Sequence, residues 1–428
     1  MNTFKVTFFA LSRNTDFEIK SEKEDITPIF NDFILAFITS IDYDNLKINV
    51  DMLQQNTEEF RKKLDSFVQN YKGFRPEIQQ LNSYFKSLEE NEYFYFLPDC
   101  TLSQEQVNQL SISLMAMKEN VNFETFSNQM NDEFGGIFNN YDIRVFCEKT
   151  IKKIGEPDKS KRICRFCNRN ATEVTFKKTA HTISEALGNK KIITNDECDS
   201  CNQYFGTGIE NDLIRYLDLY RNVFAVKGKN GIPKLKGKNF EIETSVAKTG
   251  KKEVKIKQIL TDEEINDPNR EDFKLKLEST QTVTAQNIYR TLTKYALGVI
   301  ERTELENFTK TIDWVNCKKD LDSLPKVAML TSYNLFLDHP QITVYLRKND
   351  NQNLPYAVAE FGFTFLRFAY IIPATNKDSI DFTKETDYKR FWDFFKHYSS
   401  VPDWTFTKMN DNVARKFILN LNFTKRNE

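Results

Sequence analysis

The sequence predicts an α+β protein of two or three domains, with a small cysteine-rich module between an α-rich N-terminal domain and an α+β C-terminal domain. Three observations support this prediction. A chain of 428 residues is too long for one ordinary hydrophobic core. Apolar spacings of three and four residues, typical of helices, dominate the first third, and strand-like alternation appears after residue 240. Two Cys-x-x-Cys pairs, at 164–167 and 198–201, stand between these patterns.

The N-terminal domain, of unknown role, is expected over residues 1–148. Its first ten residues alternate apolar and polar side chains and predict a strand, and Pro28 stands near the start of a predicted helix. Gly135 and Gly136 predict a turn after the last helix. The other predicted elements are helices over 28–41, 57–71, 76–88, 103–118 and 123–134 and a short strand over 93–97.

The central module is expected over residues 149–226. A polar stretch with a proline, 156–161, precedes the first cysteine pair and indicates a boundary. An amphipathic helix over 211–223 closes the module. The stretch 227–234 is rich in lysine and turn-forming residues, so it is the second predicted linker.

The C-terminal domain is expected over residues 235–428, with a role in recognition or assembly. Alternating runs over 240–246 and 253–259 flank a Lys-Thr-Gly-Lys turn and predict a hairpin. The other predicted elements are a helix over 284–302 and strands over 273–277, 327–330, 342–346 and 356–370.

The composition is typical of a globular protein of the cytoplasm. Apolar residues make up 40% of the chain and charged residues 28%, and 37 phenylalanines provide material for large cores. The N-terminus has no basic head followed by an apolar run, and the longest apolar run, near 33–41, is too short to span a membrane. The seven cysteines are an odd and sparse set in a long chain, which is not the pattern of a disulfide framework.

The net charge of −1 hides a basic centre. Residues 149–257 contain 24 Lys and Arg against 13 Asp and Glu, a surplus of 11 positive charges, and the rest of the chain is acidic. This asymmetry predicts that the centre meets a polyanion such as nucleic acid. The alternative is a lysine-rich surface that is merely solvated.

The four cysteines of the two pairs, Cys164, Cys167, Cys198 and Cys201, predict a structural Zn²⁺ site, because four thiolates suit tetrahedral zinc. Thirty residues separate the pairs, whereas ordinary zinc ribbons use a spacer of about 15–20. The extra length admits a strand ending near His181, a turn, a return strand near Ile192 and a helix entered at Cys201. Zinc would stabilise this ββα unit, which is too small for a core of its own.

These residues resemble the HNH endonucleases, whose active site is a ββα-metal finger. The resemblance covers 161–220 and depends on Cys-x-x-Cys, then Ala-His-x-Ile-x-Glu-Ala-Leu-Gly-Asn-Lys, then Glu-Cys-Asp-x-Cys-Asn-x-x-Phe-Gly. It implies that His181 is the general base and that Asn202 binds the catalytic metal ion, Mg²⁺ or Mn²⁺. It also implies that Asn195 positions the base, although Asn195 stands closer to the next cysteine than is usual in the family.

One position departs from the family pattern. Many members have Asp immediately before the base as a second metal ligand, and here that residue is Ala180. Either another oxygen serves, with Glu185, Asn189 and Glu210 as candidates, or one side chain and the substrate phosphate hold the ion. The second option is physically reasonable because Mg²⁺ often keeps several waters.

The chemistry explains why these residue types are needed. Phosphodiester hydrolysis requires a deprotonated water, and a neutral imidazole accepts a proton near neutral pH. A divalent cation neutralises charge on the phosphate and the leaving oxygen. The nearby cations Arg165, Arg169, Lys177, Lys178, Lys190 and Lys191 are predicted to hold the nucleic-acid backbone.

The resemblance implies a metal-dependent endonuclease, with DNA as the expected substrate and bacterial restriction or anti-phage defence as the expected role. RNA is the alternative substrate, because backbone hydrolysis by an external water needs no 2′-hydroxyl and the same site suits both nucleic acids. A homo-oligomer or a defence-system protein is the expected protein partner. The competing hypothesis is a non-catalytic zinc-finger module that binds nucleic acid or protein. Under it, His181 is a structural or nucleic-acid-contacting histidine, Asn202 caps a helix and Asn195 is a turn residue.

Overall fold

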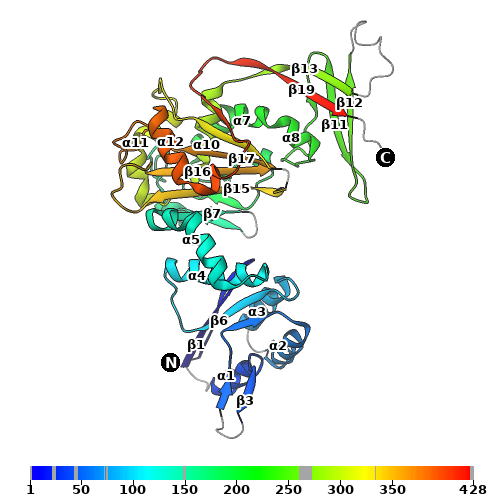
Figure 1. Ribbon diagram of the computed structural model, residues 1–428, viewed down its shortest axis with the longest axis vertical. Coiled ribbons are helices and arrows are strands. Elements are labelled where there is room, and N and C mark those ends of the chain that lie inside the picture. Colours follow the sequence, from blue (N-terminus) through cyan, green and yellow to red (C-terminus); the bar gives the residue numbers. More distant parts are fainter. Residues whose placement is uncertain are drawn as a thin grey trace. The chain divides into compact units, whose positions relative to one another are not determined.

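The computed structural model describes residues 2–21, 26–42, 47–71, 73, 76–147, 151–259, 272–332 and 334–424. The fold is mixed α+β, as predicted, and the chain divides into two compact units, Met1–Gly135 and Gly136–Glu428 (Figure 1). The predicted boundaries near 148 and 227–234 therefore lie inside the second unit. No helix among the described residues is long and apolar enough to cross a membrane.

The N-terminal unit is built on a four-stranded antiparallel sheet in the order β2-β1-β6-β5. Phe8 and Phe9 are neighbours in β1, so they point to opposite faces of the sheet and enter two different cores. Helices α1, α2 and α3 pack on the face of Phe8, and α4 packs on the face of Phe9. The strands are β1 (Asn2–Ala10), β2 (Asn14–Ser21), β3 (Ser40–Asp42), β4 (Lys47–Asn49), β5 (Leu53–Gln55) and β6 (Tyr93–Pro98). The helices are α1 (Thr27–Leu35), α2 (Glu58–Tyr71), α3 (Pro76–Ser87) and α4 (Gln104–Lys118), and α5 (Phe123–Asn140) begins in this unit and ends in the second.

Most predicted elements of this unit are confirmed, with two corrections. The first helix ends at Leu35, well before the predicted position 41. The predicted turn at Gly135-Gly136 is wrong, because α5 continues through both glycines to Asn140. A methyl group at Gly135 would meet only the side chain of Asn131 at van der Waals distance, so glycine is not required there.

The second unit is centred on a six-stranded antiparallel sheet in the order β18-β14-β17-β16-β15-β7. The predicted strand 356–370 is two strands, β16 and β17, which turn back at Phe365. The strands of the sheet are β7 (Tyr141–Phe146), β14 (Val327–Thr331), β15 (Leu337–Arg347), β16 (Ala357–Thr364), β17 (Leu366–Ile371) and β18 (Thr405–Thr407). The helices that accompany it are α10 (Ala285–Val299), α11 (Thr309–Val315), α12 (Glu385–Phe394) and α13 (Lys396–Ser399), with the 3-10 helix η3 (Arg302–Phe308).

A smaller sheet and a long two-stranded ribbon complete this unit. The predicted hairpin is confirmed as β11 (Phe240–Val246) and β12 (Lys252–Gln258), joined on one edge by β10 (Leu235–Lys236). The ribbon pairs β13 (Asp272–Val283) with β19 (Arg415–Thr424) and runs toward this sheet (Figure 1).

The residues around and between the cysteine pairs, 152–223, form short elements. They are β8 (Lys152–Ile154), η1 (Lys159–Lys161), η2 (Glu185–Leu187), β9 (Ile192–Thr194), α6 (Asp199–Thr207), α7 (Glu210–Tyr216) and α8 (Asp218–Val223). The single helix predicted over 211–223 is therefore two helices, α7 and α8, separated at Leu217.

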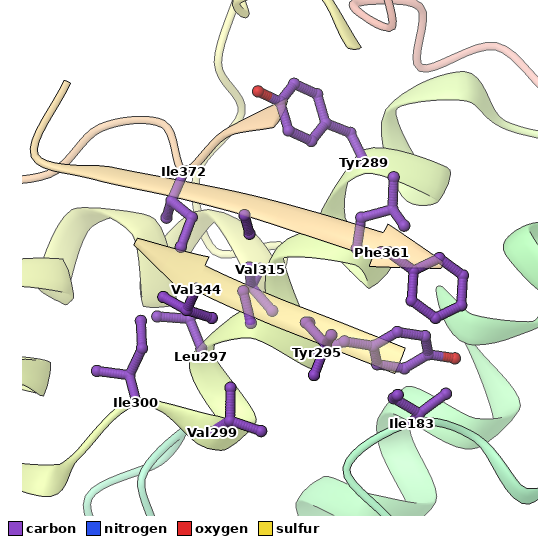
Figure 2. Packing of buried hydrophobic residues seen from close by; sticks show 14 of the residues in the cluster. Ile183, Tyr289, Tyr295, Leu297, Val299, Ile300, Val315, Val344, Phe361 and Ile372 are labelled. Atoms are coloured by element: carbon purple, nitrogen blue, oxygen red, sulfur yellow. The ribbon is translucent and has the colours of Figure 1, made fainter. Parts of the chain in front are cut away.

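One hydrophobic core joins this central region to the six-stranded sheet. It contains residues from the cysteine-rich segment, including Ile183 and Phe205, together with α10 and strands β15 to β17. Figure 2 shows Ile183 near Tyr295 of α10, whose ring lies 5.7 Å from that of Phe361 in β16. Helix α10 is thus buried on nearly all sides, and it is the element on which the central module is built.

Candidate active site

The four cysteines of the two pairs form one cluster with the geometry that zinc requires. Their sulfur atoms all lie within 4.8 Å of one another, and the sulfurs of Cys167 and Cys198 are 3.8 Å apart. Four ligands at about 2.3 Å in a tetrahedron give sulfur–sulfur separations of about 3.8 Å, so the cluster fits a zinc ion. Cys164, Cys198 and Cys201 are buried, as expected for a structural site.

The electrostatics of the cluster show why a cation suits it. The Cys164 thiol has its pKa lowered to about 5, first by the hydrogen bond with Cys201 and then by backbone N–H groups. Burial raises the pKa of Cys198 to about 11, and the pKa of Cys201 is raised by its hydrogen bond with Cys164. Four crowded sulfurs can therefore hold little negative charge on their own, whereas Zn²⁺ would favour the thiolate form of all four.

Backbone and side-chain donors already point at these sulfurs. The N–H of Cys198 donates to Cys164 Sγ at 3.4 Å, and the Arg169 guanidinium donates to Cys167 Sγ at 3.4 Å. Cys198 is the N-cap of α6, and its sulfur accepts the N–H of Cys201 at 3.5 Å. The helix N-terminus therefore stabilises negative charge on the cluster.

The predicted pair of strands is present as a short antiparallel pairing. Thr182 N–H donates to the Ile192 carbonyl at 3.0 Å, Thr194 N–H donates to the Ala180 carbonyl at 2.9 Å, and His181 bridges to Ile193. Of the two, only β9 is long enough to be a named strand. With α6 following, the order strand, strand, helix expected for the central module is confirmed.

His181 lies on the outer side of this pairing. Ala180 and Thr182, its neighbours, are buried, whereas His181 is half-buried. Because side chains alternate along a strand, the imidazole lies on the face opposite to Ala180 and Thr182. The inner face is fixed by a 2.6 Å hydrogen bond between the hydroxyls of Thr182 and Thr194.

Asn195 follows β9 and is half-buried, like Ile193 two residues earlier. By alternation it shares the face of Ile193, the residue directly opposite His181. Its side-chain amide nevertheless donates to the Gly155 carbonyl, at 3.5 Å, and its backbone N–H bonds to Ile154. The contacts of Asn195 are therefore with the β8 segment, and its role in positioning the base stays a prediction.

Asn202 is half-buried in the first turn of α6, immediately after the last cysteine. The alternative that Asn202 caps this helix is wrong, because Cys198 is the N-cap and Asn202 N–H already bonds to the Cys198 carbonyl at 2.9 Å. Its carboxamide is thus not needed for capping.

The first residue of the same helix ties it to the segment that leads to His181. The Asp199 carboxylate accepts the Lys178 N–H at 2.8 Å and the Lys177 N–H at 3.1 Å. Burial raises the pKa of this carboxyl, but the hydrogen bonds from Thr175, Lys177 and Lys178 outweigh burial and lower its pKa overall. The charged carboxylate therefore holds residues 175–178 against α6, three residues before His181.

Two of the three candidate second metal ligands are occupied elsewhere. The Asn189 amide donates to the carbonyls of Ile183 and Ile192, and its oxygen accepts two N–H groups, so it shapes the turn between the strands. Glu210 forms a 3.0 Å ion pair with the buried Lys294. Glu185, in η2, is half-buried and is the carboxylate that remains. Among the described residues, the four cysteines are the one group of three or more His, Cys, Asp and Glu side chains placed to hold a metal.

Arg165 was predicted to hold a nucleic-acid backbone, which requires an exposed side chain, but it is not exposed. Its side chain is fully buried, pairs with Asp196 at 2.7 Å and donates to the carbonyls of Leu297 and Ile300 at the end of α10. The prediction that Arg165 holds a nucleic-acid backbone is wrong. It instead joins the first cysteine pair, the end of β9 and α10.

Sequence reasoning missed the contribution of α10. The ammonium of Lys294 is buried between Glu197, at 3.1 Å, and Glu210, at 3.0 Å. Gly298 lies against the inner face of the strand pair, where a methyl group would come within 2.7 Å of Thr182. The available signals were a lysine and a glycine at positions 294 and 298, inside the helix predicted over 284–302.

Residues 164–218 match the HNH endonuclease family. No curated protein and no solved structure matches the chain significantly. The match begins at Cys164 and includes both cysteine pairs, His181 and α6 and α7, which are the elements described above. Residues 164–218 are therefore an HNH endonuclease domain, built on a four-cysteine cluster that fits zinc, within a longer mixed α+β chain.

Proposed function

We propose that this protein is a metal-dependent endonuclease that hydrolyses the phosphodiester bonds of DNA. The observation that supports this most is the placement of His181. It lies on the outer face of a strand pair whose inner face is fixed to α10, in a domain that matches the HNH endonucleases. A histidine that served only the core would be expected on the inner face.

His181 is the proposed general base. It would accept a proton from a water aligned with the scissile phosphate, in the manner of an imidazole general base. Its backbone is held on both sides by the hydrogen bonds of Thr182 and Thr194, so the ring is aimed without depending on a flexible loop.

Asn202 is the proposed side-chain ligand of the catalytic Mg²⁺ or Mn²⁺, with Glu185 as the candidate second ligand. When bound, the divalent ion would supply charge neutralisation for the phosphate and the leaving oxygen. An amide oxygen is a suitable ligand for such a hard cation, and substrate oxygens and water would fill the other positions. In this arrangement Asn195 would not bind the ion. It would help to position the base indirectly, through its contacts with the β8 segment.

Exposed lysines near His181 support a nucleic-acid substrate. Lys177, Lys178 and Lys190 are all exposed, and the backbone of the first two is fixed by Asp199. Such lysines would hold phosphates by charge without reading bases. Restriction or anti-phage defence, and assembly with a second copy or a defence partner, stay predictions from the resemblance.

The test is a plasmid-nicking assay with Mg²⁺ or Mn²⁺. Supercoiled DNA is incubated with the wild type, His181→Ala and His339→Ala, the last being an exposed histidine in β15. Loss of a general base lowers the rate by about 10²–10⁴-fold, so His181→Ala should be nearly inactive and His339→Ala should match the wild type. Equal nicking by wild type and His181→Ala, or binding to DNA without cleavage under any divalent ion, would reject the proposal and favour a non-catalytic zinc module.

A further inference from the structure

The basic charge of the central region lies mostly outside the HNH domain. Residues 164–218 contain seven Lys and Arg and eight Asp and Glu, so the domain is slightly acidic. One of its seven cations, Arg165, is buried in an ion pair. Residues 227–257, in contrast, contain ten lysines and three glutamates. The domain alone therefore offers little attraction to a polyanion, and the segment that follows offers a great deal.

These ten lysines decorate the sheet β10-β11-β12 and the loops at its two ends, a region we call the lysine arm (residues 227–258). All ten are exposed. Three form surface ion pairs with the three glutamates of the arm: Lys234 with Glu243, Lys236 with Glu241 and Lys255 with Glu253. Exposed pairs of this kind contribute about 0–1 kcal/mol and are screened by salt, so they would yield easily to phosphates.

Four lysines at the two ends of the arm form no ion pair with an acidic side chain in the described part of the chain. Lys227 and Lys229 lie in the loop before β10, and Lys248 and Lys251 lie at the hairpin turn between β11 and β12. A strand of seven residues, such as β12, is about 23 Å long at about 3.3 Å per residue. One strand of duplex DNA has a phosphate about every 3.4 Å along the axis, so this length spans roughly seven phosphates.

The base of the arm is fixed to the turn that joins the two strands of the active site. Arg221 of α8 donates to the Ala186 carbonyl in η2 at 2.8 Å. Gly228 is packed so closely against Ala186 that a methyl group there would lie 3.1 Å from the Ala186 Cα. Lys227 and Lys229 are the chain neighbours of Gly228, and Gly228 contacts Ala186 in the turn that follows His181.

The buried side chain of Asn222 fixes the sheet to the helix behind it. Its amide donates to the Ile242 carbonyl of β11 at 3.1 Å and to the Pro233 carbonyl, and its oxygen accepts the Thr244 hydroxyl at 2.8 Å. The arm thus has a defined position relative to the HNH domain, as a surface that aligns a substrate must have.

We propose that the lysine arm binds the phosphate backbone of duplex DNA and holds it across the active-site face of the HNH domain. The inference rests on the proposed nuclease function, and it assigns the main electrostatic contact to residues beyond the matched domain. Because the contacts are lysine to phosphate, binding would be independent of sequence and strongly dependent on salt.

The test measures binding separately from cleavage. All proteins carry His181→Ala, so that a fluorescein-labelled 30-base-pair duplex stays intact, and affinity is measured by anisotropy from 50 to 300 mM KCl. The arm variant carries Lys227→Ser, Lys229→Ser, Lys248→Ser and Lys251→Ser. The control carries Lys62→Ser, Lys63→Ser, Lys384→Ser and Lys389→Ser, four exposed lysines elsewhere with the same total charge.

The expected result is a salt dependence of binding that is shallower by about 3.6 in the arm variant, since each of the four lost phosphate contacts removes about 0.9 from the slope of log K against log salt. Affinity at 100 mM KCl should fall at least about tenfold, and the control should bind like the parent. Equal slopes and affinities for arm variant and control would overturn the inference even if the nicking assay succeeds. Tighter binding of a duplex RNA of the same sequence would also overturn it, because the inference names DNA. A weakened arm variant would support it even if no nicking is found.

Discussion

The N-terminal unit and the HNH domain obtain their stability in opposite ways. In the N-terminal unit, Phe33 is fully buried and its ring contacts those of Phe4, Phe8, Phe17, Phe37, Phe67 and Phe96. The HNH domain has the Phe166–Phe205 contact and little else of this kind. It is stabilised by the cysteine cluster and by α10, which lies outside the matched residues.

This difference explains where chemistry is possible. In the N-terminal unit, the buried side chains of the sheet are aromatic and aliphatic, and the exposed side chains of β2, such as Asp16 and Lys20, carry charge on the surface. The HNH domain has a four-cysteine cluster that fits zinc at one end and a buried helix on one side, and His181 lies on the outer face of its strand pair. A module that bound zinc at this cluster would be both small and rigid around His181.

The largest expected effect comes from breaking the metal site. Structural zinc contributes apparent binding energies of about 10–16 kcal/mol in small zinc modules, so Cys198→Ser or a strong chelator should unfold the HNH domain. Trp314, Trp392 and Trp404, all in the second unit, provide the readout, because Trp314 is buried in the core shared with the HNH domain. Tryptophan emission should shift to the red, while hydrogen exchange in the N-terminal unit should stay slow.

The control for this prediction is Cys317→Ser, since Cys317 is exposed and outside the cluster. It should leave both the emission and the zinc content, one ion per chain, as in the wild type. An unchanged emission spectrum after complete zinc removal would contradict the view that metal orders this domain.

The reverse experiment is Phe33→Ala in the N-terminal unit. Removing a buried phenylalanine costs about 3–5 kcal/mol, and here the ring has six aromatic neighbours. Hydrogen exchange in this unit should accelerate. The unfolding transition of the second unit, followed by tryptophan emission, and plasmid nicking should stay unchanged. Phe30→Ala, at an exposed position of the same helix, should cost under about 1 kcal/mol. A parallel loss in the tryptophan transition would show that the two units are thermodynamically coupled.

The same contrast separates what the sequence could predict from what it could not. The zinc cluster, the strand–strand–helix order and most helices follow from local patterns, because ligand spacing and apolar periodicity are properties of short segments. The role of α10 does not, since Lys294 and Gly298 meet Glu197, Glu210 and Thr182 only through tertiary packing.

Arg165 illustrates the same limit, because a cation beside a cysteine pair looks like a phosphate ligand until its buried partner Asp196 is seen. The turn predicted at Gly135-Gly136 was wrong because glycine lowers helix propensity by only about 1 kcal/mol, which helix packing can offset.

A smaller effect is expected where α10 contacts the strand pair. Gly298→Ala would place a methyl group 2.7 Å from Thr182 Cγ2 and 3.3 Å from the Thr194 hydroxyl, two side chains fixed by their mutual hydrogen bond. Overpacking of this kind costs about 1–3 kcal/mol, more than the gain of about 1 kcal/mol in helix propensity. The free energy of unfolding of the second unit, followed by tryptophan emission, should fall. Plasmid nicking should also fall, because the strand carrying His181 is displaced. Gly135→Ala is the matched control, since its methyl group has room and should stabilise α5. Equal effects of the two substitutions would mean that the close approach of α10 is not required.

The smallest expected effect distinguishes the two units by pH. All three histidines, His181, His339 and His397, lie in the second unit. Burial lowers the pKa of His397 to about 4, below the value of about 6.5 that an unfolded chain gives histidine. The folded state therefore binds fewer protons than the unfolded state between these values. The stability that the neutral His397 ring contributes to the folded state is complete above about pH 6.5 and is lost as the pH falls toward 4.

Each pKa unit corresponds to about 1.4 kcal/mol, and partial exposure of the ring reduces the effect, so the second unit should lose about 1–2 kcal/mol between pH 7 and pH 5. Urea unfolding followed by tryptophan emission measures this loss. His397→Gln should flatten the dependence, whereas His339→Gln should retain it. The N-terminal unit has no histidine, so its hydrogen-exchange stability should change less over this range. If His397→Gln keeps the wild-type dependence of unfolding free energy on pH, the pH response of the second unit must come from its carboxylates. Lowering the pH would then not destabilise one unit selectively, as zinc removal does.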